Sequence, residues 1–157
     1  MSDYKINFVD ELSEDIEKVM RKDLIEYETN HGIDVNFKRF VLVLTDETDK
    51  VIGVLNAYTA YSEVYIDDMW VHKSYRGKGC GKQLIQTLED HFESKGFNNI
   101  NLVTSAFNAP GFYEKCGFTA EFVRENKVNP KLTKTFFVKY FKNTIQTQGV
   151  IKHQGKL

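Results

Sequence analysis

One run of residues constrains the fold more than any other: a strand, a glycine-rich turn, a helix and a second strand between residues 64 and 104. Val64–Val71 and Asn99–Thr104 are rich in residues that favour strands. The segment between them is predicted to be a helix, because its apolar or small residues share one helical face: Gly81, Leu84, Ile85, Leu88 and Phe92. Gly96 marks the end of this helix. A strand, a crossover helix and a strand predict a parallel pair inside a mixed sheet.

The flanking segments predict further strands and helices. Three consecutive antiparallel strands are expected over Phe40–Leu44, Val51–Tyr61 and Val64–Val71, with a hairpin turn at 46–50 between the first two. A helix is expected after Ser13, since apolar residues recur on one face at Ile16, Val19, Met20, Leu24 and Tyr27. Shorter patterns predict strands at Lys5–Asp10, Phe118–Val123 and Thr135–Phe141 and a helical turn after Pro110. The fold class is therefore mixed α/β (α+β), a mostly antiparallel central sheet flanked by helices in the order β-α-β-β-β-α-β-α-β-β.

Length and charge limit the possible partners. With 157 residues, we expect one domain over 1–142 and a polar tail over 143–157. The net charge of -1 gives no overall basic field for nucleic acid, and no apolar run approaches the ~18 residues of a membrane span. The N-terminus lacks a signal-peptide pattern, so we expect a cytoplasmic protein. We also expect it to be a monomer or a homodimer. Cys80 and Cys116 form no Cys-x-x-Cys pair, and no metal site is expected.

The densest chemical signal is the turn from Tyr75 to Lys82, which reads YRGKGCGK. Glycines allow backbone N–H groups to approach a ligand closely, and the start of a helix favours negative charge, so the turn suits phosphate oxygens. A Walker A loop is excluded, because Arg76 and Gln83 occupy positions that need glycine and Ser or Thr. The spacing of the glycines also fails the dinucleotide fingerprint. The alternative is a glycine-rich turn that binds nothing.

This turn resembles the pyrophosphate loop of the GNAT superfamily of acyl-CoA-dependent N-acyltransferases, which reads Arg or Gln, two residues, Gly, one residue, then Gly or Ala. The segment from Arg76 to Gly81 matches every fixed position. Residues 69–72 (MWVH) resemble the family's preceding strand end, and residues 112–118 (FYEKCGF) resemble the segment that follows its next strand. The resemblance covers roughly residues 4–141 and indicates a small bacterial-type member.

The resemblance implies acetyl-CoA as cosubstrate, with no metal. The diphosphate would be held by the loop residues Arg76, Gly77, Lys78, Gly79, Cys80, Gly81 and Lys82. Backbone groups of Met69 and Val71 would pair with the pantetheine arm as an added strand. Many members carry a pantetheine-contacting asparagine where this chain has Ala106, so that role is transferred to Asn108.

Two residues are expected to carry the chemistry. The family match makes Tyr113 the general acid that protonates the leaving thiolate; the alternative is an aromatic that packs a short helix on the sheet. Asp67 and Asp68 are unusual within a strand, and alternation places them on opposite faces of the sheet. Asp67, grouped by alternation with Tyr65, Met69 and Val71, is favoured as the anchor or base for the acceptor amine, against a role in an ion pair or a loop cap.

The favoured function is direct transfer of an acetyl group from acetyl-CoA to a primary amine of a small molecule or peptide. A ping-pong route through Cys116 or Cys80 is disfavoured, because neither cysteine has a base evident from the sequence. The alternative function is a non-catalytic acyl-CoA-binding or interaction domain that retains the fold.

Overall fold

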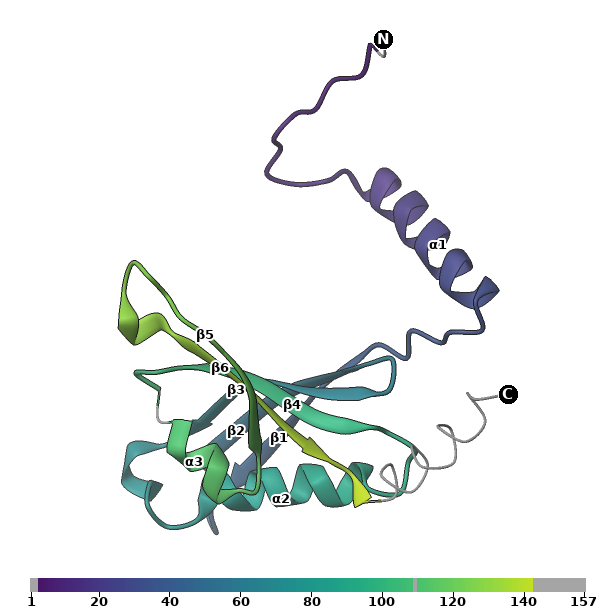
Figure 1. Ribbon diagram of the computed structural model, residues 1–157. Coiled ribbons are helices and arrows are strands. Elements are labelled where there is room, and N and C mark those ends of the chain that lie inside the picture. Colours follow the sequence, from purple (N-terminus) through teal and green to yellow (C-terminus); the bar gives the residue numbers. More distant parts are fainter. Residues whose placement is uncertain (1–2, 109, 143–157) are drawn as a thin grey trace, which may run out of the picture. The chain divides into compact units, whose positions relative to one another are not determined.

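The computed structural model describes residues 3–108 and 110–142, so the tail predicted for 143–157 lies outside the described residues. The chain falls into two compact units, Met1–Val35 and Asn36–Leu157. No helix among the described residues is long and apolar enough to cross a membrane. The elements, shown in Figure 1, are α1 (Glu14–Asn30), β1 (Lys38–Thr45), β2 (Val51–Ala60), β3 (Glu63–Val71), the 3₁₀ turn η1 (Lys73–Tyr75), α2 (Cys80–Phe92), β4 (Asn99–Ser105), α3 (Pro110–Lys115), β5 (Thr119–Arg124), the 3₁₀ turn η2 (Pro130–Leu132) and β6 (Lys134–Tyr140).

The first unit contains the predicted amphipathic helix, α1. It begins after Ser13, has Glu14 and Asp15 in its first turn, and ends before Gly32, whose φ of 72° favours glycine. The amide of Gly32 donates to the carbonyl of Thr29, which closes the last turn. The helix predicted from the period of its apolar residues is therefore confirmed.

The strand predicted for Lys5–Asp10 is not formed, which corrects the first element of the expected order. Ile6 and Phe8 alternate as a strand requires, yet they are 96% and 105% exposed and belong to no strand. A strand depends on hydrogen bonds to a neighbouring strand, and alternation in sequence does not supply that neighbour.

The second unit is built on a six-stranded sheet in the order β1-β2-β3-β4-β6-β5. All neighbouring strands are antiparallel except β3 and β4, which are parallel. The parallel pair predicted from the strand, helix and strand pattern is thus confirmed, as is the mostly antiparallel mixed sheet. Since β6 lies between β4 and β5, the last two strands form a hairpin that adds to the sheet through its second strand.

Both α2 and α3 pack on one face of this sheet (Figure 1), and the core lies between them and the strands. Leu88 of α2 is fully buried together with Leu55, Val64 and Ile100 of the sheet. Burial of these side chains supplies the main stabilisation, at roughly 1.5–3 kcal/mol for each large aliphatic residue. No helix of the described residues within 36–142 covers the opposite face, where Val41 and Val43 are exposed.

A β-bulge divides β3 into two halves. Ala57 of β2 pairs with Ile66 and Asn56 pairs with Asp68, so Asp67 is an extra residue without a partner on β2. Ile66 is buried in the core before the bulge, and Met69 packs against the core after it. The two aspartates therefore lie together on the open face, and both are exposed. The prediction that alternation places them on opposite faces is wrong, because the bulge shifts the alternation by one residue. The predicted grouping of Asp67 with Tyr65, Met69 and Val71 is wrong for the same reason. Met69 and Val71 face the helices, whereas Tyr65 does not.

Candidate active site

The glycine-rich turn leads from the end of β3 into α2. Gly77 and Gly79 have φ values of 73° and 84°, and a Cβ at either position would meet no heavy atom within 4 Å. The left-handed backbone, rather than crowding by the protein, is therefore what requires glycine here. Gly79 is the N-cap of α2 and provides no side chain to cap it, so the amides of the first turn remain available to an external acceptor.

Three cationic residues lie within the glycine-rich turn and the first turn of α2. Arg76, Lys78 and Lys82 are all exposed. The Nε of Arg76 donates to the carbonyl of Val71 at 2.9 Å, which joins the start of the turn to the end of β3. The Nζ of Lys78 lies 5.5 Å from the centre of the Tyr75 ring. The turn thus combines free amide donors, a helix N-terminus and positive side chains, which together favour an anion.

Gly81 brings α3 against the start of α2. A Cβ at Gly81 would lie 3.0 Å from Cζ of Phe112 and 3.6 Å from Cε of Met69. Any larger residue would have to displace the Phe112 ring by a few tenths of an ångström, so close packing favours glycine at this position. Met69, Gly81 and Phe112, from three motifs singled out in the sequence, are therefore brought together in space.

The sheet is split beside this cluster. β3 and β4 pair only where Glu63–Tyr65 lies beside Asn99–Asn101, although β3 continues to Val71. Among the described residues, the section of β3 from 66 to 71 has no ladder partner on the side of β4. An open strand edge of this kind can accept an extended ligand as an additional strand.

Tyr113 lies on α3, next to Phe112. Its ring packs edge-on against Phe118 at 6.1 Å and contacts Phe137 at 5.9 Å, measured between ring centres. Burial raises the pKa of the Tyr113 phenol above its ordinary value, and the neighbouring Cys116 adds to the effect. Tyr113 is therefore protonated at neutral pH and retains a proton that it can donate.

Asp67 lies on the open face of the sheet and forms an ion pair. Its Oδ2 is 3.4 Å from Nη1 of Arg39, and the two side chains are 50% and 64% exposed. The guanidinium of Arg39 also lies 5.1 Å from the centre of the Tyr58 ring. Such an exposed pair contributes little to stability, about 0–1 kcal/mol, and its carboxylate can exchange partners with a cationic ligand.

Asn108 occupies the turn between β4 and α3, with its side chain exposed. Its amide donates to the carbonyl of Ser105 at 2.8 Å, and its carbonyl accepts from the hydroxyl of Thr104. Among the described residues, no hydrogen bond or ion pair connects Asp67 or Asn108 with Tyr113. The structure thus gathers the turn, Met69 and the α3 segment, while Asp67 lies on a separate surface.

Sequence reasoning missed the partners that these residues acquire. Arg39 is 28 positions from Asp67 in the chain. The hydroxyl of Tyr75 donates to Asp46 at 3.2 Å and so joins the glycine-rich turn to the β1–β2 hairpin. Hydrogen bonds from Thr48 lower the pKa of Asp46, and the bond from Tyr75 adds to this effect. No local pattern predicts the contacts of Arg39 or Tyr75.

Among the described residues, no group of three or more His, Cys, Asp or Glu side chains is arranged to hold a metal ion.

Comparison with known proteins agrees with this geometry. The profile of the Acetyltransferase (GNAT) family matches residues 6–118, well over half of the chain. The chain belongs to this family. A crystal structure of an acetyltransferase from Bacillus cereus ATCC 14579 superposes with a TM-score of 0.70 at 25% identity, over 85% of this chain and 97% of that one.

Two further relatives are described by their substrates or ligands. The chain is 36% identical over 63 residues to glucosamine 6-phosphate N-acetyltransferase of Arabidopsis thaliana, a match over 40% of this chain and 42% of that protein. The chain therefore spans about two fifths of the length of this curated relative. A protein of Bacillus anthracis str. Ames, described as a streptothricin acetyltransferase in complex with acetyl coenzyme A, superposes with a TM-score of 0.58 at 25% identity, over 66% of this chain and 63% of that one.

Proposed function

We propose that this GNAT protein transfers an acetyl group from acetyl-CoA directly to a primary amine of a small molecule or peptide. The observation that carries the proposal is the glycine-rich turn, whose uncapped helix N-terminus lies at the end of the strand that is open toward β4. These two features suit the two parts of one donor, a diphosphate and an amide-containing arm.

In this proposal, acetyl-CoA is bound mainly by backbone groups. Amides of residues 77–82 bind the diphosphate, with Arg76, Lys78 and Lys82 adding positive charge. The backbone of Met69 and Val71 pairs with the pantetheine arm, and Asn108 contacts the same arm from the β4–α3 turn. The acetyl-CoA complex of the Bacillus anthracis relative supports this choice of donor.

The transfer step follows from this placement. The neutral amine nitrogen attacks the thioester carbonyl carbon, the C–S bond breaks, and the departing thiolate takes the proton of the Tyr113 phenol. The nitrogen loses one proton as the amide forms, and a proton from solvent restores the phenol. An alkyl amine with a pKa of about 10 is about three units from being neutral at pH 7, equivalent to roughly 4 kcal/mol, so its proton must be removed before attack. Burial raises the pKa of the Cys116 thiol, which agrees with direct transfer rather than a covalent cysteine intermediate.

Asp67 is assigned to the acceptor amine, as an anchor or base. Its carboxylate is half exposed and is paired with the exposed side chain of Arg39, so an incoming ammonium group can replace the guanidinium. The similarity to a glucosamine 6-phosphate N-acetyltransferase supports a small phosphorylated amine as the acceptor, so we include glucosamine 6-phosphate among the candidate acceptors.

The test is the release of free thiol from acetyl-CoA with a panel of amines: glucosamine 6-phosphate, polyamines, amino acids, aminoglycosides and short peptides. We expect at least one amine to give steady release of CoA and an acetylated product of the corresponding mass. CoA-dependent thermal stabilisation without turnover of any amine would instead indicate an acyl-CoA-binding domain.

A further inference from the structure

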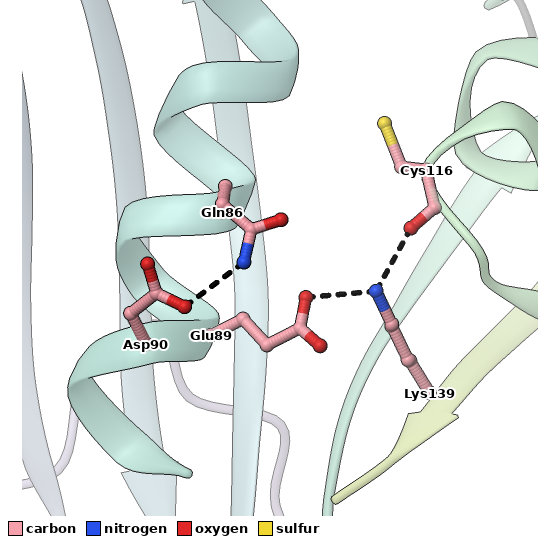
Figure 2. Close-up of polar contacts among 5 residues, drawn as sticks. All are labelled: Gln86, Glu89, Asp90, Cys116 and Lys139. Atoms are coloured by element: carbon pink, nitrogen blue, oxygen red, sulfur yellow. Dashed lines mark hydrogen bonds and ion pairs between the residues drawn. The ribbon is translucent and has the colours of Figure 1, made fainter.

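Lys139 of β6 makes a partly buried connection between α2 and the turn that follows α3. Its Nζ lies 2.7 Å from Oε2 of Glu89 and donates to the carbonyl oxygen of Cys116 at 3.1 Å. The Lys139 and Glu89 side chains are only 26% and 19% exposed. Figure 2 shows the ammonium group between the two acceptors, with Glu89 reaching from α2 and Cys116 from the turn after α3.

The turn that receives this ammonium group also determines where Tyr113 lies. The amide of Phe118 donates to the carbonyl of Tyr113 at 3.1 Å, and the amide of Cys116 is shared between the carbonyls of Phe112 and Tyr113. Gly117 has a φ of 91°, and a Cβ there would meet Nζ of Lys139 at 3.1 Å. Carbonyls at the end of a helix lack donors from within the helix, and Lys139 supplies one to Cys116.

α3 needs such a connection because it is short. It has six residues, none of which is fully buried, and a helix of one to two turns is not stable by itself. Its place on the sheet therefore depends on the rings of Phe112 and Tyr113 and on the turn at its C-terminus. α2, in contrast, has 13 residues and four buried side chains, so Glu89 offers a fixed anchor.

We propose that the Lys139–Glu89 pair is a positioning element, which connects the end of α3 to α2 and thereby holds the Tyr113 phenol beside the proposed acetyl-CoA site. The inference rests on the proposed function for what Tyr113 does in the reaction. Neither Lys139 nor Glu89 touches the substrate in this arrangement, and neither exchanges a proton with it.

The chain offers a matched control on the same helix. Nε2 of Gln86 donates to Oδ1 of Asp90 at 2.9 Å on the exposed side of α2, and this pair contacts no other element through that bond (Figure 2). Asp90→Asn changes one carboxylate near Glu89 without touching the connection to α3. Glu89→Gln and Lys139→Met change the connection itself, and Lys139→Arg keeps a cationic donor.

Two measurements separate positioning from general stability. The first is kcat and KM for acetyl-CoA in single-turnover and steady-state assays with the responsive amine. We expect Lys139→Met to lower kcat roughly 10- to 100-fold with KM within about twofold, since a small displacement of a reacting group has effects of this size. Lys139→Arg should recover part of the loss, Glu89→Gln should lie between them, and Asp90→Asn should match the wild type.

The second measurement is the ultraviolet titration of Tyr113, obtained as the difference between each protein and its Tyr113→Phe counterpart, which needs no activity. In the wild type burial keeps the Tyr113 pKa raised. In Lys139→Met the phenol should titrate closer to pH 10, because a displaced ring is better solvated.

The outcomes differ for the two proposals. A folded Lys139→Met protein with unchanged kcat and unchanged Tyr113 titration overturns the positioning role, even where its melting temperature falls. If Lys139→Met does not fold, Glu89→Gln decides in the same way. A wild type that acetylates no amine overturns the proposed function alone, and the Tyr113 titration then still decides whether Lys139 positions the phenol.

Discussion

Gly79 allows the donor site to be tested separately from the stability of the fold. Its φ is 84° and it lies at the N-terminus of α2, while Gly96, after the other end of the helix, has a φ of 82°. A Cβ at either glycine would meet no heavy atom within 4 Å. Gly79→Val and Gly96→Val therefore impose the same kind of backbone strain, and only the first introduces a side chain into the proposed diphosphate site.

The expected changes in melting temperature follow from the matched backbone strain of the two variants. A left-handed backbone costs an L-residue about 1–2 kcal/mol, so both variants should melt roughly 2–8 °C below the wild type. CoA at one hundred times its dissociation constant should stabilise the wild type by about 2.7 kcal/mol, which corresponds to a shift of roughly 5–11 °C. We expect Gly96→Val to keep this shift in full and Gly79→Val to lose it, because the branched side chain blocks approach of the phosphate to the amides.

Differential scanning fluorimetry across a CoA series, with far-ultraviolet circular dichroism to confirm folding, provides the measurement. The reasoning fails if folded Gly79→Val keeps the wild-type CoA shift. It also fails if Gly96→Val loses the shift to the same extent, because the effect would then belong to the helix as a whole.

Three further predictions concern the acid, the acidic pair and one tyrosine outside the site. Tyr113→Phe should keep CoA binding and lower kcat by about 10²-fold in single-turnover assays. The wild-type rate should persist to above pH 10 before it declines, because burial raises the Tyr113 pKa. If the variant turns over at the wild-type rate, Tyr113 is a packing residue. Asp67→Asn should lower kcat/KM for the amine by roughly 10²-fold with little change in acetyl-CoA affinity, and Asp68→Asn should have a smaller effect. Small and equal losses would show that Asp67 neither anchors nor deprotonates the amine. The hydrogen bond to Glu63 raises the Tyr65 pKa to about 12, so the stability from this bond should be complete below pH 10 and disappear as the pH rises toward 12. Glu63→Gln should return the ultraviolet titration of Tyr65 toward pH 10, and an unchanged midpoint would show that Glu63 does not cause the raised pKa.

Patterns that depend on neighbours in the sequence predicted most of the fold. The apolar period of α1, the turn at 46–50 and the glycine-rich turn before α2 are consequences of residues within a few positions of one another. The turn sequence also located the candidate donor site, because glycines and cations at the start of a helix have a local chemical meaning.

The rest depended on contacts between distant segments. The segment from 5 to 10 has the composition of a strand without forming one, since strand pairing is not encoded in alternation. Lys139 and Glu89 are 50 positions apart, and no spacing rule relates them. The bulge at Asp67 appears only when the register of β2 against β3 is known, so two adjacent aspartates in a strand could be recognised as unusual but not assigned to faces.

The bulge also determines where β3 tolerates a change in length. Ile66 and Met69 both contribute to the core, although three positions separate them where regular alternation would require an even number. Deleting either Asp67 or Asp68 would place Ile66 and Met69 two positions apart, so a regular strand would still direct both side chains into the core. Deleting Tyr65 instead would make Val64 and Ile66 adjacent, and one of these buried residues would turn toward the open face. Among relatives of this protein, the loss of a single codon within β3 is therefore expected at the aspartate pair rather than in the first half of the strand.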